Sequence, residues 1–356
     1  MTAMTSTTAY AFLLRPSHNR VYAQASHELA RAELRVFGET ALRGRIADVD
    51  GAELGGVPYV TFSSPGLPEG DLRTLAALSS LHALFEVRQD AGDAGPLLRP
   101  VALTRPDRFP SDLLTIQKYP GKTNEDFTRL LLNVTAMACD RPEGLLTGGL
   151  RVFDPLCGRG TTLNQALMYG LDSAGVERDA KSFEAYQNFL RQWLKNSRLK
   201  HRAESGAVRR DRRTLGRRFH VEVGESKESY KQGRAVDLTM VQADTAASGE
   251  FFRPGSFDLI VTDAPYGVQH GSSDAGGRSR SPLPLLAGAL PAWTRLLRVG
   301  GAIGISWNTY VASREELAEL LAGHGFEVRD SEAHRAFRHR VDHAILRDLI
   351  VARRVR

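Results

Sequence analysis

The chain has 356 residues, of which 42% are hydrophobic, and its formal net charge is +6. This length predicts two folded domains, and the apolar content argues against a disordered chain. There is no long uncharged apolar run, and no basic stretch precedes an apolar one at the start, so we expect neither a membrane span nor a signal peptide, and a cytoplasmic location. Cys139 and Cys157 fit no metal or disulfide spacing, so no metal is expected, whereas the positive charge favours nucleic acid as a partner.

Residues 1–100 predict a ferredoxin-like α+β domain, because their apolar periodicity follows the order β-α-β-β-α-β. The expected strands are 10–14, 45–49, 57–63 and 83–88, and the expected helices are 26–36 and 71–81. A turn-rich stretch at 90–96 ends this domain. We expect residues 101–121 to form a linker and residues 122–356 to form the second domain.

The second domain is predicted to be α/β with a doubly wound, Rossmann-like sheet, because strands and helices alternate from residue 150 onward. The expected strands are 150–154, 173–177, 236–243, 257–263 and 302–307, then a terminal pair near 326–333 and 343–352. The expected helices are 162–169, 182–195, 283–297 and 313–323. Five parallel strands followed by an antiparallel pair match the methyltransferase variant of this fold.

A basic insertion at 196–233 interrupts the alternation. Such runs are usually solvated or disordered, yet they also bind phosphates, and the sequence leaves both interpretations open. If the insertion binds nucleic acid, its candidate contacts are Arg209, Arg210, Arg212 and Arg213.

A glycine loop follows the first strand of the second domain, in Asp154-Pro155-Leu156-Cys157-Gly158-Arg159-Gly160-Thr161-Thr162. Asp154, Gly158, Gly160 and Thr161 are candidates for holding a nucleoside cofactor, because glycines let the backbone approach a ligand and the following helix start offers free amide donors. A dinucleotide fingerprint needs a third glycine where this chain has Leu163, so hydride transfer is the weaker interpretation.

Two acidic residues close the next two strands. Glu177 is placed to accept both ribose hydroxyls of a nucleoside, or alternatively to cap the helix that begins near Lys181. Asp244 is placed to accept from an adenine amino group, or alternatively to cap a short segment at 245–248.

A helix is also expected just before the first strand of this domain. Thr123 and Asp126 approximate a capping box, and an apolar stripe begins at Phe127. Because this helix would run beside the glycine loop, Thr123 and Asn124 are further candidates for the cofactor, with a simple capped core helix as the alternative.

The tetrapeptide Asp263-Ala264-Pro265-Tyr266 ends the apolar strand 257–263 and is the candidate catalytic site. The exocyclic amine of a nucleobase is a poor nucleophile, so a catalyst must accept its protons and hold it in line with an activated methyl group. The Asp263 carboxylate and the Ala264 carbonyl are suitable acceptors, Pro265 stiffens the turn, and Tyr266 can stack on a base. An ordinary turn after a buried strand is the alternative.

The segment after Tyr266 is rich in glycine and serine and carries Arg278 and Arg280. It is either a flap over the target nucleotide, with both arginines on phosphates, or a plain surface loop.

These motifs resemble those of the tRNA guanosine-N2 methyltransferases that usually carry a THUMP domain, within the larger group with an Asp-Pro-Pro-Tyr motif. The resemblance covers about residues 115–355, with Ala264 in place of the first proline and a shortened N-terminal region. It implies a class I methyltransferase in which Asp154, Gly158, Gly160, Glu177 and Asp244 hold S-adenosylmethionine and Asp263 and Tyr266 hold the target base. The expected partner is RNA, most simply tRNA. The alternatives are a DNA adenine-N6 or cytosine-N4 methyltransferase and an RNA-binding protein with a decayed active site.

Overall fold

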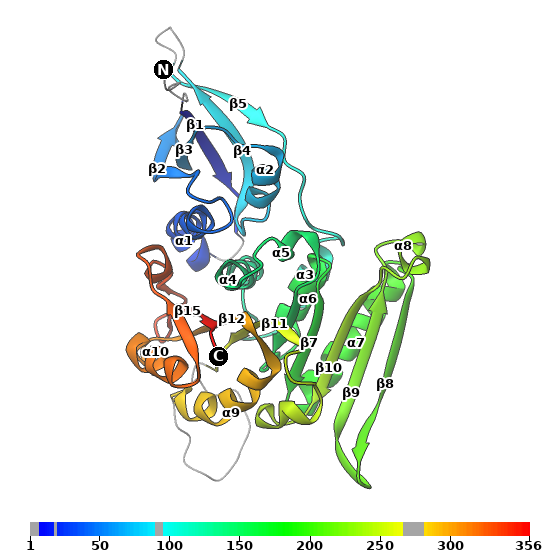
Figure 1. The fold of residues 1–356 in the computed structure, drawn as a ribbon. Helices are drawn as coiled ribbons and strands as arrows, with labels where there is room; N and C mark the ends of the chain where they lie inside the picture. Colours follow the sequence, from blue (N-terminus) through cyan, green and yellow to red (C-terminus); the bar gives the residue numbers. More distant parts are fainter. Residues whose placement is uncertain (1–6, 18–19, 90–94, 266–280) are drawn as a thin grey trace.

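The N-terminal part of the computed structural model is a five-stranded antiparallel sheet in the order β2-β3-β1-β4-β5 (Figure 1). The structure describes residues 7–17, 20–89, 95–265 and 281–356. The elements are β1 (Thr8–Leu14), α1 (Arg20–Glu39), β2 (Ala47–Leu54), β3 (Val57–Ser64), α2 (Glu69–Leu75), β4 (Leu81–Arg88) and β5 (Leu97–Val101). The first four strands have the expected ferredoxin-like order, and β5 adds a strand beside β4.

One expected helix is shorter than its periodicity predicts. The helix expected at 71–81 ends at Leu75, because Leu81 already pairs with Leu14 as part of β4. Between the two elements, Ser79 is held by the buried Glu33 side chain of α1 rather than by a further helical turn.

The second sheet contains the parallel core that the alternation predicts. Along the path β13-β15-β12-β11-β6-β7-β10-β9-β8, the strands β12, β11, β6, β7 and β10 are parallel neighbours, and β15 is antiparallel to β12. Their bounds are β6 (Arg151–Asp154), β7 (Asp172–Glu177), β10 (Val236–Gln242), β11 (Phe257–Asp263), β12 (Leu297–Asn308), β13 (Phe326–Arg329), β14 (His339–Arg340) and β15 (Leu346–Arg354). This strand order confirms the expected class I methyltransferase fold.

Helices cover both faces of this sheet, because side chains alternate along its strands. On β11, Leu259 and Val261 pack in one core with α4, whereas Ile260 packs in another with α9 and α10. The helical elements are α3 (Asp112–Thr115), α4 (Glu125–Ala138), α5 (Gly144–Thr147), α6 (Thr161–Met168), α7 (Ala180–Asn196), η1 (Thr245–Glu250), α9 (Leu283–Leu296), α10 (Arg314–Gly323) and η2 (Ala333–Arg335). Among the described residues, no helix combines the length and apolarity needed to cross a bilayer.

The two sheets share a core at their junction, where α1 lies against α4 (Figure 1). Glu33 of α1 is fully buried and accepts hydrogen bonds from the Ser79 backbone and hydroxyl and, at 2.7 Å, from Asn133 of α4. Asn133 accepts in turn from the Tyr169 hydroxyl at 2.7 Å. The junction is therefore apolar, and the buried Glu33 carboxylate within it is hydrogen-bonded. The expected domain limits at residues 100 and 121 stay a prediction.

The basic insertion is an ordered hairpin and not a disordered segment, although most residues of its tip are exposed to solvent. It consists of β8 (His201–Arg210) and β9 (Arg213–Val223), followed by α8 (Lys227–Lys231), and β9 pairs antiparallel with β10. Asp211 and Arg212 both have positive φ, as a two-residue hairpin turn requires. Apolar residues such as Phe219 are fully buried and hold the hairpin in the sheet, which a count of charges overlooks.

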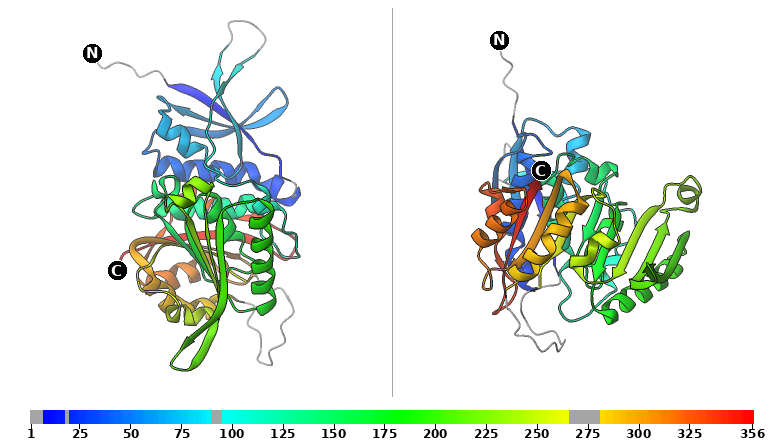
Figure 2. Two further views of the ribbon diagram at one scale, coloured as in Figure 1. Left: turned by 90° about the vertical axis from the view of Figure 1, so that its right-hand side faces the viewer. Right: turned by 60° about the horizontal axis from the view of Figure 1, so that its bottom comes forward.

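The hairpin tip projects past the carboxyl ends of the parallel strands (Figure 2). Arg217 pairs with Gln242, the last residue of β10, so Arg213–Gly216 extend beyond that end. Four residues of a strand span about 14 Å. The arginine-rich turn thus lies on the same side of the sheet as the ends of β6, β7 and β11.

Candidate active site

Asp263 ends β11 and its carboxylate is held by three side chains. Thr123 donates a 2.6 Å hydrogen bond to Oδ2, the Ser306 hydroxyl bonds to Oδ1, and the Arg347 guanidinium lies 3.7 Å from Oδ2. Ser306 is opposite Asp263 in the parallel register of β12. The carboxylate is half-buried and oriented before any ligand arrives, which is the property required of an acceptor for amine protons.

Ala264 and Pro265 follow the end of β11. The backbone NH of Ala264 donates to the Ser306 carbonyl at 2.8 Å, and the alanine methyl is buried in the core beside α9. A small side chain is thus accommodated where the related motif has proline. Pro265 is exposed, and Tyr266 lies outside the described residues.

Arg347 and Ser306 are site residues that the sequence did not indicate. Arg347 is 5% exposed, its guanidinium lies 4.4 Å above the Phe127 ring, and it comes from β15, more than eighty residues after Asp263. His339 pairs with Arg347 across β14 and β15. Burial lowers the pKa of His339 to about 4, so this neighbour stays neutral at physiological pH.

The glycine loop has the conformation that a close-lying ligand needs. Gly158 and Gly160 have φ of 52° and 78°, which side chains rarely tolerate. A Cβ at Gly158 would meet no atom within 4 Å, so the space above the loop is open, whereas one at Gly160 would collide with Tyr186. Thr161 begins α6 and its hydroxyl lies 3.2 Å from the Tyr119 hydroxyl. These residues fit a nucleoside cofactor.

Asp154 is buried beneath this loop. Its Oδ1 accepts from Leu156 N at 3.1 Å and from Thr262 Oγ1 at 3.0 Å. Burial raises its pKa to about 7; hydrogen bonds from Thr162, Leu156 and Thr262 oppose that rise, and the nearby Asp263 charge adds to it. Asp154 therefore changes charge near neutral pH, next to the place where a cationic cofactor is expected.

Glu177 is the last residue of β7 and pairs with Gln242 of the neighbouring β10, and Asp244 lies just after β10. Burial raises the pKa of Glu177, whose Oε1 accepts from Asp179 N at 2.6 Å. The alternative role of Glu177 as a helix cap is wrong, because Asp179 caps α7. Asp244 does cap η1, accepting from Ala246 N at 2.9 Å, and its role at an adenine stays a prediction.

Thr123 and Asn124 lie at the start of α4, as expected, but Asn124 takes the capping role that was predicted for Thr123. Asn124, not Thr123, is the N-cap and accepts from Phe127 N at 3.1 Å. The expected capping box of Thr123 and Asp126 is wrong, because the helix begins one residue later and the Thr123 hydroxyl is bonded to Asp263. Their contact with a cofactor stays a prediction.

The candidate nucleic-acid contacts gather at the hairpin tip. Arg210 is anchored to Glu250, with Nη1 2.6 Å from its carboxylate. Within the described part of the chain, Arg209, Arg212 and Arg213 have no ion pair and are exposed. Arg278 and Arg280 lie outside the described residues.

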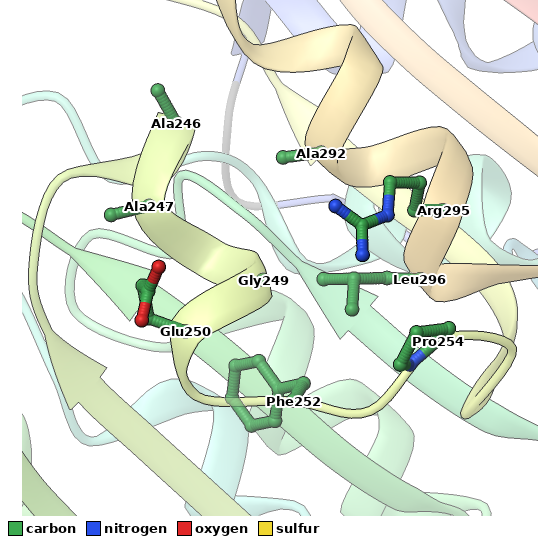
Figure 3. A pocket seen from close by; sticks show the side chains of 9 residues that line it. All are labelled: Ala246, Ala247, Gly249, Glu250, Phe252, Pro254, Ala292, Arg295 and Leu296. Atoms are coloured by element: carbon green, nitrogen blue, oxygen red, sulfur yellow. The ribbon is translucent and has the colours of Figure 1, made fainter. Parts of the chain in front are cut away.

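Two further groups of residues are separate from this site. A cavity of about 230 Å³ lies between η1 and α9, among residues such as Glu250, Phe252 and Arg295 (Figure 3), and no candidate site residue lines it. His220, Glu222 and Asp237 bring ligand atoms within 4.8 Å of one another on β9 and β10. This potential metal cluster lies on the hairpin side of the sheet and does not include Asp263.

Comparison with known proteins points to one domain family. Residues 144–279 match the family model described as an RMKL-like methyltransferase domain. A curated relative, the ribosomal RNA large subunit methyltransferase K/L of Marinomonas sp. (strain MWYL1), is 30% identical over 137 residues. That match covers 36% of this chain and 18% of the relative, so the chain spans about a fifth of the relative's length.

Two of the solved structures with a similar fold are described here. TrmN from Thermus thermophilus is 12% identical, with a TM-score of 0.45 over 98% of this chain and 100% of its own. A putative RNA methyltransferase from Pyrococcus horikoshii is 16% identical, with a TM-score of 0.39 over 69% of this chain and 89% of its own. TM-scores this low carry no argument about the fold of this chain, which is assigned from its strand order.

The matched residues run from α5 to beyond β11 and contain both motifs. At the level of this domain, the expected S-adenosylmethionine-dependent methyltransferase is confirmed. The match does not confirm the resemblance to tRNA enzymes with a THUMP domain.

Proposed function

We propose that this chain is an RNA methyltransferase that transfers the methyl group of S-adenosylmethionine to an exocyclic amine of a nucleobase, guanosine N2 in tRNA. The observation that carries the proposal is the oriented Asp263 carboxylate at the same sheet edge as the glycine loop, Glu177 and Asp244. The matched methyltransferase domain supports the reaction class.

The chain's own residues supply acceptors and positioning. Bound S-adenosylmethionine supplies an electrophilic methyl group on a sulfonium. The Asp263 carboxylate accepts a hydrogen bond from one N–H of the target amine and the Ala264 carbonyl accepts one from the other, which orients the nitrogen lone pair toward the methyl group. Once methylated, the amine would release one proton, and the Asp263 carboxylate is the group placed to take it up. Thr123, Ser306 and Arg347 keep the Asp263 carboxylate in position meanwhile.

RNA as the substrate is supported by the arginines of the hairpin tip. Three arginines of the tip extend past the sheet edge at which Asp263 lies, namely Arg209, Arg212 and Arg213. The net charge of the whole chain is +6, which also favours an anionic partner. We propose that they contact phosphates of a folded RNA whose target base is unpaired at Asp263. Arg210 instead braces the hairpin against η1 through Glu250.

Ribosomal RNA is the second candidate substrate, because the curated relative is named a ribosomal RNA methyltransferase. The protein should be incubated with labelled S-adenosylmethionine and, separately, with tRNA, ribosomal RNA and DNA. Label in tRNA at guanosine N2 supports the proposal, label in ribosomal RNA selects the second candidate, and label in DNA alone rejects both. Cofactor binding without transfer to any nucleic acid would also reject them.

The matched variant for this assay is Asp263→Ala. We expect loss of transfer with little change in cofactor affinity, because the carboxylate acts on the acceptor and not on the cofactor. Retained activity would remove Asp263 from the site. RNA binding without cofactor binding by the wild-type protein would indicate a decayed active site.

A further inference from the structure

Three metal-ligating side chains converge where β9 pairs with β10, on the face of the sheet that turns away from α7 (Figure 1). His220 and Glu222 lie two residues apart on β9, and Asp237 of β10 is directly opposite Glu222 in the antiparallel register. The alternate residues Val221 and Leu238 pack in the core with α7, so the three polar side chains point to the other face. They are 21%, 35% and 49% exposed, so a dissolved cation can reach them.

The spacing of these groups is too wide for hydrogen bonds and close to that of ligands on one metal ion. His220 Nε2 lies 3.7 Å from Glu222 Oε1 and 3.8 Å from Asp237 Oδ1. An N–H···O hydrogen bond spans only about 2.7–3.2 Å. Two donors on a tetrahedral zinc ion, each about 2.0–2.2 Å from it, are roughly 3.4 Å apart. Because all three donor atoms lie within 4.8 Å of one another, small side-chain rotations bring them onto a common ion.

The His220 ring is oriented by its other nitrogen. Nδ1 lies 2.9 Å from Oγ1 of Thr239, the residue opposite His220 on β10. Metal-binding histidines use the second ring nitrogen in this way, and an Nδ1–H that donates to Thr239 leaves the Nε2 lone pair facing the carboxylates. The Tyr230 hydroxyl donates to Oε2 of Glu222 at 3.4 Å, which leaves Oε1 toward His220. Two of the three side chains are therefore already held.

The two carboxylates lack a basic partner. Within the residues that the structure describes, neither Glu222 nor Asp237 is paired with an Arg or Lys, and each is paired with His220. A third carboxylate is close, because Asp172 accepts from the backbone NH of Asp237 at 2.9 Å. Burial and then the charge of Asp172 raise the pKa of Asp237. A divalent cation would supply the positive charge that this group of residues lacks.

We propose that His220, Glu222 and Asp237 bind a divalent transition-metal ion of the zinc class, which fastens β9 to β10. An imidazole ligand favours Zn²⁺ over Mg²⁺ and Ca²⁺, which prefer oxygen ligands alone. Three protein ligands leave one position of a four-coordinate ion for water. Because β9 leads to the arginine-rich tip, the ion stabilises the hairpin and takes no part in methyl transfer. The expectation of no metal rested on cysteine spacing, which carries no information about this site.

Calorimetric titration of the EDTA-treated protein with zinc chloride tests the site. We expect equimolar binding by wild type and no binding by Asp237→Asn or His220→Gln at micromolar protein. Thr239→Val keeps the side-chain shape, removes the hydroxyl and should weaken binding roughly 10–100-fold. The matched control is His201→Gln on β8 of the same hairpin, where Nδ1 lies 2.8 Å from the Leu199 carbonyl oxygen. That variant should bind Zn²⁺ as wild type does.

Thermal unfolding supplies a second measurement. An ion that binds only the folded protein stabilises it, so Zn²⁺ should raise the Tm of wild type and leave that of Asp237→Asn unchanged. Mg²⁺ at the same concentration should change neither. Asp237 is half-exposed, so its amide variant should fold, and circular dichroism checks this.

Four results would overturn the proposal. Absence of Zn²⁺ binding by wild type would show an ordinary ion-pair cluster, and binding that every variant retains would show an adventitious surface ion. An equal Tm rise in wild type and Asp237→Asn would remove the link between β9 and β10. An equal response to Mg²⁺ would reject a metal of the zinc class. None of these measurements uses methyl transfer, so they are independent of the proposed function.

Discussion

Thr123 Oγ1 donates a hydrogen bond of 2.6 Å to Oδ2 of Asp263, across 140 positions of sequence. The bond joins the turn before α4 to the carboxyl end of β11. It makes the position of the acceptor carboxylate depend on a helix that lies outside the tetrapeptide motif.

Thr123→Val should therefore slow methyl transfer about tenfold or more, because small displacements of a positioned group reduce kcat strongly. Single-turnover rates with saturating RNA and S-adenosylmethionine measure this effect. Thr123→Ser keeps the hydroxyl and should stay near the wild-type rate. If Thr123→Val weakens S-adenosylmethionine binding instead, Thr123 serves the cofactor, as the sequence suggested.

Cofactor affinity should depend on the charge of Asp154. Because burial raises its pKa to about 7, Asp154 is mainly neutral at pH 6 and mainly ionised at pH 8. A sulfonium ligand favours the ionised form, so the Kd for S-adenosylmethionine should be roughly tenfold higher at pH 6 than at pH 8. Calorimetric titration of wild type and Asp154→Asn distinguishes this origin, since the variant should lose the pH dependence.

The same group makes a predictable contribution to folding stability. The folded pKa of about 7 exceeds the ordinary 3.8, so the folded protein binds the proton more tightly than the unfolded chain. The stabilisation is greatest below about pH 4 and is lost as the pH rises through 7. In urea unfolding from pH 5 to 8, Asp154→Asn should lose less stability with rising pH than wild type; parallel curves would contradict this origin.

The free arginines of the hairpin tip should carry part of the salt dependence of RNA binding. Replacing both Arg212 and Arg213 with Gln should weaken binding and reduce the slope of log K against log salt by about 1.5–2. The control replaces Lys227 and Lys231 of α8, which are exposed at the other end of the same hairpin. Equal losses in the two double variants would show a general charge effect and no specific contact.

The junction of the two sheets should depend on Glu33. Glu33→Ala leaves the buried Ser79 backbone NH and Asn133 amide without their acceptor, and should lower the free energy of unfolding by about 3 kcal/mol or more. Glu28→Ala, on the exposed side of the same helix, should change little because its ion pair with Arg31 is largely solvated. Urea denaturation of both variants makes the comparison. A small effect at Glu33 would mean that water replaces the carboxylate.

Much of the fold follows from local patterns. The apolar run at 257–263 coincides with β11, and the alternation of strands and helices predicts parallel strands whose carboxyl ends meet at one edge. That rule alone brings Asp154, Glu177 and Asp263 to the same side. The basic insertion was less predictable, because the few buried residues that pair β9 with β10 are outnumbered by arginines.

By itself, the sequence determined the elements, the glycine loop and the acidic residues that end the parallel strands, because apolar periodicity and turn residues act over a few positions. Only the tertiary structure decided what holds Asp263: Thr123 from before the first strand of the sheet, Ser306 from the adjacent strand and Arg347 from the last. It also decided that Asn124 caps α4 and that Asp237 of β10 lies beside His220 and Glu222 of β9. These relationships join residues far apart in the chain, and they depend on how packed helices and strands bring side chains together, which no local pattern records.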